Sequence, residues 1–269
     1  MSVTPTFDKT RGLGRAALVG YLPAGFPTVA GSIAAIDAMI DAGCDIIEVG
    51  LPYSDPVMDG HAIQRAAATA LAGGCRTREV LGVVEAVAGR GVPILVMTYW
   101  NPVEKYGVDA FARDFSAAGG SGLITPDLIP DEAGEWLAAA DDRGLDRVFL
   151  VAPSSTKERI AITVAASRGF VYAQSIMGIT GARDATSAAA PGLVERTRAA
   201  TDLPIGVGLG VRSREQAAEV AAYGDAVIVG SAMVSCLLDA ETEKQGLARL
   251  SELTTQLADG VSRGTKPTR

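Results

Sequence analysis

The sequence is poor in the residues that build disulfide frameworks and metal centres. It has three cysteines, Cys44, Cys75 and Cys236, which lie far apart and form no C-x-x-C motif, and a single histidine, His61. An odd number of scattered cysteines argues against a disulfide framework and a zinc site, and is typical of a reducing compartment. We therefore expect three small buried hydrophobic side chains, no metal ion and a cytoplasmic location.

Positive charge and long apolar runs are also scarce. The chain has 24 basic and 31 acidic residues, a net charge of −7 and no long run of either sign, which argues against a nucleic-acid partner. No stretch approaches the roughly 18 uninterrupted apolar residues of a membrane span, and the first twenty residues lack the apolar core of a signal peptide. The sequence predicts a soluble protein that is not exported and has no membrane partner. A small anionic substrate stays compatible with this charge, because backbone dipoles can bind a phosphate.

Eight short runs rich in Val, Ile, Leu and Gly recur along the 269 residues. They are AALVGY, IIEVGL, ILVMTY, GLIT, RVFLVA, FVYAQ, PIGVG and AVIVG, beginning at residues 16, 46, 94, 122, 147, 170, 204 and 226. Each is followed by a loop and an amphipathic segment, a pattern that indicates a parallel sheet covered by helices. Eight such units in about 250 residues favour a closed (β/α)8 TIM barrel over an open sheet.

The connection between the second and third runs is unusually long. It starts at Pro52 and contains two predicted helices, HAIQRAAATALAG and TREVLGVVEAVAG, which meet at Gly73-Gly74. Insertions at this end of a barrel strand carry function. We expect one TIM-barrel domain over residues 1–269 with extra helices, including this insertion, and a polar tail that frays over about 262–269.

Glu48 lies inside the second apolar run, Asp45-Ile46-Ile47-Glu48-Val49-Gly50. A period of two puts Ile46, Glu48 and Gly50 on one face, which is either the barrel lumen or the helix layer, and both are dry. A carboxylate is costly to ionise there, so its pKa should be raised and it can exchange a proton near neutrality. A structural glutamate paired with an unseen Lys or Arg is the alternative.

The loop LPYSDPVMDG follows this strand and carries Asp55 and Asp59. Two aspartates beside a strand carboxylate could hold a divalent metal, but their spacing fits no known metal loop. Asp55 could instead form an Asx-turn or a helix cap, and Asp59 could cap the helix that starts near His61. His61 is expected at the surface or at a helix start, since no G-x-S-x-G elbow supports a mechanism through it.

Glycines gather where the seventh and eighth strands end. The segments are GVGLGVRS (206–213) and VGSAMV (229–234). GVGLG is not the Rossmann fingerprint, because Val211 stands where the third glycine is needed. Barrels frequently hold phosphate between these two loops, so the pair predicts a phosphate cradle. Tight packing of helix on strand is the alternative.

The sixth strand and the loop after it carry two further candidates. The loop SIMGITGARDATSAAAP has glycines at 178 and 181 and the composition of a mobile lid, with an ordinary long surface loop as the alternative. Tyr172, within the strand, could place its phenol at the barrel mouth or could be a plain core aromatic.

Taken in order along the chain, seven segments resemble the alpha subunit of tryptophan synthase. They are YLPAGFPT, EVGLPYSDPVMDG, MTYWNP, LITPDLIPDEA, MGITGAR, GVGLGV and VGSAMV. The resemblance spans nearly all of the chain and implies a TIM-barrel lyase of tryptophan biosynthesis, which cleaves indole-3-glycerol phosphate to indole and D-glyceraldehyde 3-phosphate by a retro-aldol reaction. It implies no metal and no cofactor in this chain. It also implies a partner, a beta subunit that carries pyridoxal phosphate, receives indole through a tunnel and condenses it with L-serine, in an alpha2beta2 heterotetramer.

The resemblance also implies roles for individual residues. Glu48 matches the general acid/base that protonates indole C3, and Asp59 matches the carboxylate that engages the indole N–H. Tyr172 matches a tyrosine near the scissile bond, Thr180 a lid threonine that orients the aspartate, and Asp55 a loop residue that signals to the beta subunit. The phosphate cradle would comprise Gly181, Gly210, Gly230 and Ser231. The indole pocket would comprise Tyr21, Met97, Tyr99, Ile124 and Leu150.

Two segments depart from the family pattern. Tyr21 stands where a phenylalanine is common, and FVYAQSIMG differs from the usual leucine-serine-arginine version. These departures concern the packing of the pocket and the lid. Neither touches Glu48 or Asp59.

Two rival readings of the sequence remain. One is another phosphate-binding barrel, such as indole-glycerol-phosphate synthase or a phosphoribosyl isomerase; the synthase needs a catalytic lysine on a strand, and no predicted strand contains one. The other is a catalytically weak binding subunit whose main task is to activate a partner. Indole release measured with and without a beta subunit distinguishes these readings.

Overall fold

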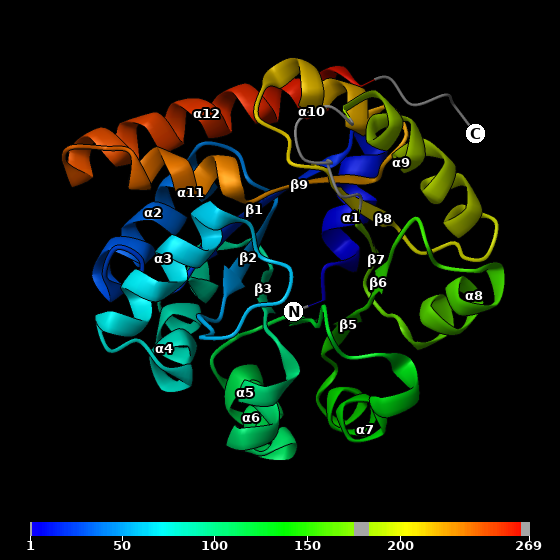
Figure 1. Cartoon of the computed structure of the whole chain (residues 1–269), viewed down its shortest axis with the longest axis horizontal. Coiled ribbons are helices and arrows are strands. Elements are labelled where there is room, and N and C mark those ends of the chain that lie inside the picture. Colours follow the sequence, from blue (N-terminus) through cyan, green and yellow to red (C-terminus); the bar gives the residue numbers. More distant parts are fainter. Residues whose placement is uncertain (1, 175–182, 265–269) are drawn as a thin grey trace.

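The structure is a computed structural model that describes residues 2–174 and 183–264. Its strands are β1 (Ala17–Pro23), β2 (Ile46–Gly50), β3 (Ile94–Met97), β4 (Gly122–Ile124), β5 (Asp146–Val148), β6 (Leu150–Val151), β7 (Val171–Gln174), β8 (Ile205–Gly208) and β9 (Ala226–Val229). They form one parallel sheet in the order β5-β4-β3-β2-β1-β9-β8-β7-β6, surrounded by helices (Figure 1). All eight predicted runs therefore form strands, and the fifth run is divided between β5 and β6.

The division of the fifth run closes the sheet into a barrel. β5 pairs with β4 and β6 pairs with β7, so the two ends of the sheet are consecutive pieces of one stretch of chain. Only Phe149 separates them, and its carbonyl accepts a hydrogen bond from the Tyr172 N–H at 3.1 Å. The prediction of a (β/α)8 TIM barrel is confirmed.

Helices follow the strands and cover the outside of the barrel (Figure 1). They are α1 (Thr4–Gly12), α2 (Val29–Asp41), α3 (His61–Ala72), α4 (Thr77–Val87), α5 (Trp100–Tyr106), α6 (Val108–Ala117), α7 (Gly134–Arg143), α8 (Lys157–Ala166), α9 (Arg183–Arg198), α10 (Arg214–Ala221), α11 (Ser231–Leu238) and α12 (Glu243–Arg263), with 3-10 turns η1 (Ala88–Arg90) and η2 (Pro130–Glu132). Local signals start several of them: the hydroxyls of Thr28 and Ser213 accept the backbone N–H three residues later, as N-caps do.

The insertion between β2 and β3 has the predicted form. It contains α3 and α4, which meet at Gly73-Gly74. Gly74 has φ +87°, a left-handed conformation that glycine adopts without steric penalty, and this allows the chain to reverse between the two helices. The loop from Leu51 to Gly60 precedes α3 and therefore lies at the carboxyl end of the strands, where barrels carry their active sites.

Two packing layers lie on opposite faces of the barrel strands. Alternate strand residues fill the lumen, among them Val19, Ile46, Leu95, Ile124 and Phe170, all fully buried. The intervening residues face the helices and belong to a larger apolar cluster. Because of this alternation, every second side chain of a strand points into the lumen, and several residues of the site described below occupy such positions.

Helix α1 closes the amino end of the barrel and lies across the centre of the ring of strands in Figure 1. Val3 and Phe7 are buried and belong to the lumen cluster, where the Phe7 ring lies 5.6 Å from that of Phe170. The buried carboxylate of Asp146, at the start of β5, accepts hydrogen bonds from the Val3 N–H at 2.8 Å and the Ser2 hydroxyl at 3.0 Å. These contacts hold the amino-terminal segment to the barrel.

Three sequence predictions need correction or limits. Cys44 and Cys75 are buried as predicted, but Cys236 is only partly buried, because it lies on α11 near the surface. The second half of the predicted lid loop is helical from Arg183, as its alanine-rich composition permits, and residues 175–182 lie outside the described part of the chain. The predicted frayed tail overlaps α12, which continues to Arg263, and residues 265–269 also lie outside the described part.

A search for membrane-spanning segments covered the described residues. No helix among them is both long enough and apolar enough to cross a bilayer.

Candidate active site

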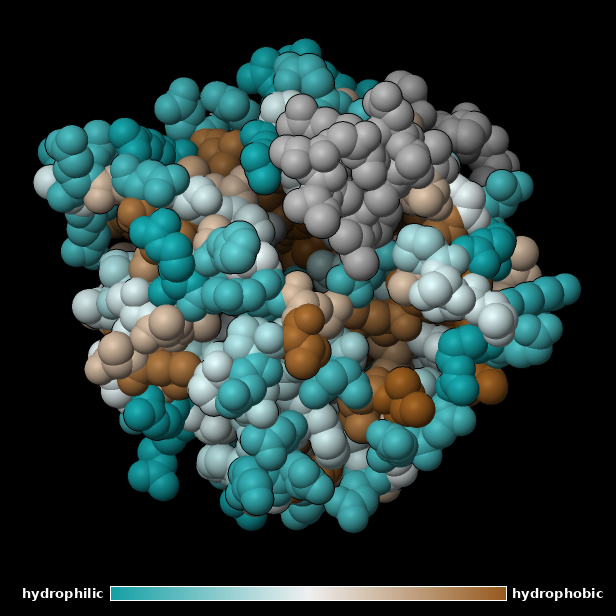
Figure 2. Space-filling model, in the orientation of Figure 1, coloured by the Kyte–Doolittle hydropathy of each residue, from teal (hydrophilic) through white to brown (hydrophobic). Residues whose placement is uncertain are grey.

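The lumen face of the strands brings most of the predicted site residues together. Glu48 on β2 pairs in register with Tyr21 on β1, and Leu150 on β6 pairs with Tyr172 on β7. Met97, Ile124, Leu150 and Tyr172 all pack with the lumen cluster. Figure 2 shows a recess near the middle of the face seen in Figure 1, with apolar side chains inside it.

Glu48 is a buried carboxylate, and no cation in the described part of the chain pairs with it. Its side chain is 1% exposed, and its Oε2 atom has no hydrogen-bond partner among the described residues. Burial, and to a smaller extent the nearby charge of Asp59, raises the pKa of Glu48 to about 8. Among the described residues no Lys or Arg forms an ion pair with Glu48 or contributes to this shift, which argues against an ion-paired structural glutamate. Glu48 can carry a proton at neutral pH and release it to a nearby base.

Asp59 lies on the loop before α3 and is only partly buried. The hydroxyl of Tyr99 donates a hydrogen bond to Asp59 Oδ1 at 3.2 Å. Burial raises the pKa of the Asp59 carboxyl, while the bond from Tyr99 lowers it and so favours the ionised form. The alternative of a helix cap is wrong: Gly60 is the residue before α3, and within the described chain no side chain caps that helix.

A pocket at the barrel mouth contains Asp59 and three of the predicted indole-pocket residues. It is lined by Tyr21, Leu51, Asp59, Met97, Thr98, Tyr99 and Pro126. Sequence reasoning missed three of these, Leu51, Thr98 and Pro126. Each comes within two residues of the end of β2, β3 or β4, so strand ends were the signal that could have found them. Ile124 lies deeper, in the lumen cluster below the mouth.

Glycines on neighbouring strands make room for the two tyrosines of the lumen. A Cβ on Gly50 would lie 2.3 Å from Tyr21 Oη, and one on Gly230 would lie 3.2 Å from Tyr21 Cδ1. A Cβ on Gly208 would lie 2.4 Å from Tyr172 Oη. Burial, then the charges of Asp59 and Glu48, raise the pKa of Tyr21 well above its usual value. Burial and the Glu48 charge do the same to the pKa of Tyr172, so both phenols stay protonated and can donate hydrogen bonds.

The predicted phosphate cradle lies beside this pocket. Helix α11 begins at Ser231 directly after Gly230, and among the described residues no side chain caps it, so its first N–H groups are available to an anion. Gly210, after β8, is exposed and has φ +66°, a left-handed conformation that favours glycine. A Cβ on Gly60 would lie 3.8 Å from Ser231 Oγ, which places the cradle next to the loop that carries Asp59. Gly181 and Thr180 lie outside the described residues.

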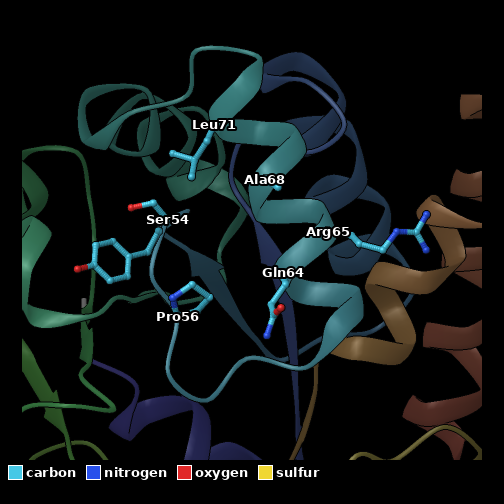
Figure 3. A pocket seen from close by; sticks show the side chains of 7 residues that line it. Ser54, Pro56, Gln64, Arg65, Ala68 and Leu71 are labelled. Carbon is cyan, nitrogen blue, oxygen red and sulfur yellow. The ribbon is translucent and has the colours of Figure 1, made fainter.

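A second, larger hollow of about 540 Å³ lies outside the barrel, between the loop before α3 and α3 itself. Figure 3 shows Ser54 and Pro56 on the loop facing Ala68 and Leu71 on the helix, with Gln64 pointing to the loop and Arg65 pointing away. Neither Glu48 nor Asp59 lines this hollow. The mouth pocket, in contrast, is lined by Asp59 and by Tyr21, the residue that pairs in register with Glu48, so we take the mouth pocket as the candidate active site. Asp55 is exposed on the same loop, and its carboxylate accepts a hydrogen bond from Ser54 at 2.5 Å.

A search for possible metal ligands covered the described residues. In the described ranges no group of three or more His, Cys, Asp and Glu side chains could hold a metal ion. His61 is exposed as the first residue of α3, as predicted for a residue at a helix start.

Comparison with known families and sequences gives matches over nearly the whole chain. The model of the family described as tryptophan synthase alpha chain matches residues 7–262. The tryptophan synthase alpha chain of Mycobacterium marinum is 63% identical over 263 residues, covering 98% of this chain and 96% of the relative. That of Salinispora arenicola is 65% identical over 255 residues, covering 95% and 96%.

Solved structures agree with these matches. A structure of Mycobacterium tuberculosis tryptophan synthase is similar with a TM-score of 0.90 and 62% identity, covering 96% of this chain and 97% of that one. The tryptophan synthase alpha chain from Legionella pneumophila has a TM-score of 0.88 at 29% identity, with 97% of each chain covered. The barrel and its extra helices are thus retained where more than two thirds of the residues differ.

Proposed function

The chain belongs to the tryptophan synthase alpha chain family, and from this premise we propose that Glu48 and Asp59 are its two catalytic carboxylates. Membership of the family gives the chain the lyase activity of the alpha reaction in tryptophan biosynthesis. That reaction is the cleavage of indole-3-glycerol phosphate to indole and D-glyceraldehyde 3-phosphate. The observation that carries the proposal is the buried, unpaired Glu48, whose pKa of about 8 leaves it protonated at neutral pH.

Glu48 acts first as a general acid. Breaking the bond between the indole ring and the glycerol chain requires C3 of the ring to accept a proton, which converts the ring to the protonated, positively charged form of its indolenine tautomer; the electron pair of the broken bond then returns to the ring. A carboxylic acid in a dry lumen can deliver that proton, because its surroundings disfavour the charged form until the proton has a better acceptor. The carboxylate that remains can then take the proton from the glycerol hydroxyl as the carbon–carbon bond breaks and the aldehyde forms.

Asp59 stabilises the ring nitrogen during the same step. Protonation at C3 draws electron density from the nitrogen, and its N–H becomes a stronger hydrogen-bond donor. An ionised carboxylate facing that N–H stabilises the developing positive charge. The Tyr99 hydroxyl supports this role, because its bond to Oδ1 favours the ionised form of Asp59 and directs the carboxylate.

The remaining site residues bind and orient the substrate in this proposal. Gly210, Gly230 and Ser231 hold the phosphate with backbone N–H groups and the helix dipole of α11. Apolar surfaces of Tyr21, Met97 and Tyr99 enclose the indole ring. Ile124 and Leu150 support them from the lumen, and the protonated Tyr172 phenol lies near the scissile bond. Gly181 and Thr180 stay predicted members of the cradle and the lid.

We propose no cofactor or metal for this chain and one protein partner. The exposed loop with Asp55 would contact a tryptophan synthase beta subunit, and Asp55 would transmit the state of one site to the other. The hollow beside that loop gives a partner an irregular surface to fill (Figure 3). The alpha2beta2 stoichiometry, pyridoxal phosphate in the beta subunit, the tunnel and the cytoplasmic location stay predictions.

Substitution of Glu48 by Gln tests the proposal. The change keeps side-chain volume but removes the proton donor, so indole release from indole-3-glycerol phosphate should fall about 10²- to 10⁴-fold. Binding of glyceraldehyde 3-phosphate, measured by calorimetry, should stay within about twofold of the parent, because the cradle is untouched. Glu104→Gln, an exposed change on α5, serves as the control. Retention of turnover by Glu48→Gln would remove Glu48 from the mechanism.

A further inference from the structure

Two side chains, one at the end of β3 and one in the loop after β4, form hydrogen bonds with the peptide group between Tyr99 and Trp100. The Thr98 hydroxyl, at the end of β3, donates to the Tyr99 carbonyl at 2.8 Å. The Asp127 carboxylate, in the loop after β4, accepts from the Trp100 N–H at 2.9 and 3.2 Å. The oxygen of this peptide thus accepts a hydrogen bond from one side chain, and its N–H donates to another.

These hydrogen bonds restrain the backbone that carries the Tyr99 side chain. Tyr99 is the residue before α5, with φ −63° and ψ 156°, and no side chain of its own caps that helix within the described chain. Rotation of the following peptide plane is rotation about ψ of Tyr99, so hydrogen bonds at both ends of the plane restrain how α5 leaves the strand and the backbone from which the Tyr99 side chain projects. Asp127 takes the place of the missing cap and places a negative charge at the start of α5.

Tyr99 in turn connects this peptide to the loop that carries Asp59. Its ring is buried, with 5% exposure, and lies 5.2 Å from the ring of Tyr53. Its hydroxyl accepts from the Met58 N–H and donates to Asp59 Oδ1, both at 3.2 Å. A tilt of the ring would therefore break the contacts that orient the Asp59 carboxylate.

We propose that Thr98 and Asp127 are positioning residues that clamp the Tyr99–Trp100 peptide and thereby hold the Tyr99 hydroxyl against Asp59. The inference rests on the proposed role of Asp59 and adds two residues that touch neither carboxylate. Both were absent from the sequence-derived site. The clamp links the ends of β3 and β4 to the loop after β2. Residues that follow three successive strands thus fix the position of the Asp59 carboxylate.

Three substitutions and one control variant test the clamp. Asp127→Ala removes the acceptor of the Trp100 N–H and should lower kcat about 5- to 10-fold, with KM for indole-3-glycerol phosphate changed less than about twofold. Asp127→Asn keeps an acceptor oxygen without the charge and should recover most of the loss. Asp131→Ala is the control, because this aspartate lies nearby on η2, is exposed as Asp127 is, and pairs with Arg159. Thr98→Val, which removes only the hydroxyl from the other side, should reduce kcat in the same direction as Asp127→Ala.

A double-mutant cycle with Tyr99→Phe gives the decisive result. If Asp127 acts through the Tyr99 hydroxyl, Asp127→Ala should lower kcat less than about twofold once that hydroxyl is absent. Equal losses in both backgrounds would overturn the proposal. So would an Asp127→Ala effect that appears only with a beta subunit present, since that indicates a partner contact. Absence of turnover by the parent chain in both conditions would instead refute the proposed function.

Discussion

Glu48 and Asp59 are both carboxylates, but their surroundings give them different protonation. Glu48 is enclosed by the lumen and faces another negative charge, so its neutral form is favoured. Asp59 is only partly buried; burial raises its pKa as well, but the hydrogen bond from Tyr99 opposes that rise and stabilises the ionised form. The proposed reaction requires this difference, because one group must donate a proton to carbon while the other stabilises the electron-poor ring nitrogen.

The protonation of Glu48 predicts the pH dependence of the reaction. Because the step needs the protonated acid and its pKa is about 8, turnover should fall as pH rises above 8, approaching tenfold per pH unit. Asp59→Asn removes a like charge beside Glu48, which favours the ionised form of Glu48 and should lower its pKa. Carbon-13 NMR of the Glu48 carboxyl, recorded against pH without substrate, measures that change directly.

Asp55→Asn is the control for this titration. Asp55 is on the same loop but exposed, and it contributes nothing to the shift of Glu48. The Glu48 pKa should be the same in this variant as in the parent chain. A fall of equal size with Asp55→Asn and Asp59→Asn would mean that net charge, and not contact with Asp59, governs Glu48.

At the scale of elements, the cradle depends on how a strand passes into a helix. β9 ends at Val229, Gly230 is the residue before the helix, and α11 starts at Ser231 with no described side chain capping its first N–H groups. The glycine also accommodates the Tyr21 ring, since a Cβ on it would press on that ring at 3.2 Å. The proposed site thus assigns this one residue to both the phosphate cradle and the indole pocket.

Ser231→Ala should weaken phosphate binding without removing it. The substitution deletes one hydroxyl donor but leaves the backbone N–H groups and the helix dipole, so we expect the Kd for glyceraldehyde 3-phosphate to rise about 5- to 10-fold. Calorimetric titration measures the change. Ser235→Ala, one turn later on α11, should leave the Kd unchanged. A normal Kd for Ser231→Ala would show that the hydroxyl does not contact the phosphate.

At the scale of the whole molecule, the first and last helices pack against elements from other parts of the chain. α1 fills the amino end of the barrel, and α12 packs against α10, where Arg214 pairs with Asp259 at 2.8 Å. A Cβ on Gly43, just after α2, would lie 3.0 Å from Ala258 of α12. Because both terminal helices contact elements far away in sequence, we propose that residues 1–269 form one domain.

Asp146 is expected to stabilise this closed structure. Asp146→Ala leaves the buried Val3 N–H without its acceptor and frees the amino-terminal segment, so the free energy of unfolding should fall by about 2 kcal/mol. Urea denaturation measures the loss, and hydrogen exchange should show faster exchange in α1. Asp8→Ala, on the exposed face of α1 beside Arg11, should change stability by less than about 0.5 kcal/mol. Equal stability of the two variants would contradict the anchoring role of Asp146.

Most of the fold could be predicted from the sequence, because it depends on local patterns. The period of two on the strands put Glu48 on the same face as Ile46, glycines marked the turns into helices, and alanine-rich segments indicated the helices between strands. The resemblance to the tryptophan synthase alpha family added the pairing of Glu48 with Asp59. Where composition alone had to separate a loop from a helix, as beyond Arg183, the prediction was wrong.

The tertiary structure alone decided which alternatives hold at the two carboxylates. Pattern left open whether Glu48 met a cation and whether Asp59 capped α3, because both questions concern contacts between residues far apart in the chain. The lumen places no described cation beside Glu48, and the fold brings Tyr99 to Asp59 across 40 positions of sequence. The hydrogen bonds of Thr98 and Asp127 to one peptide group also join residues from different strand ends. Such contacts depend on the order of strands in the sheet, and the local spacing of apolar residues does not predict them.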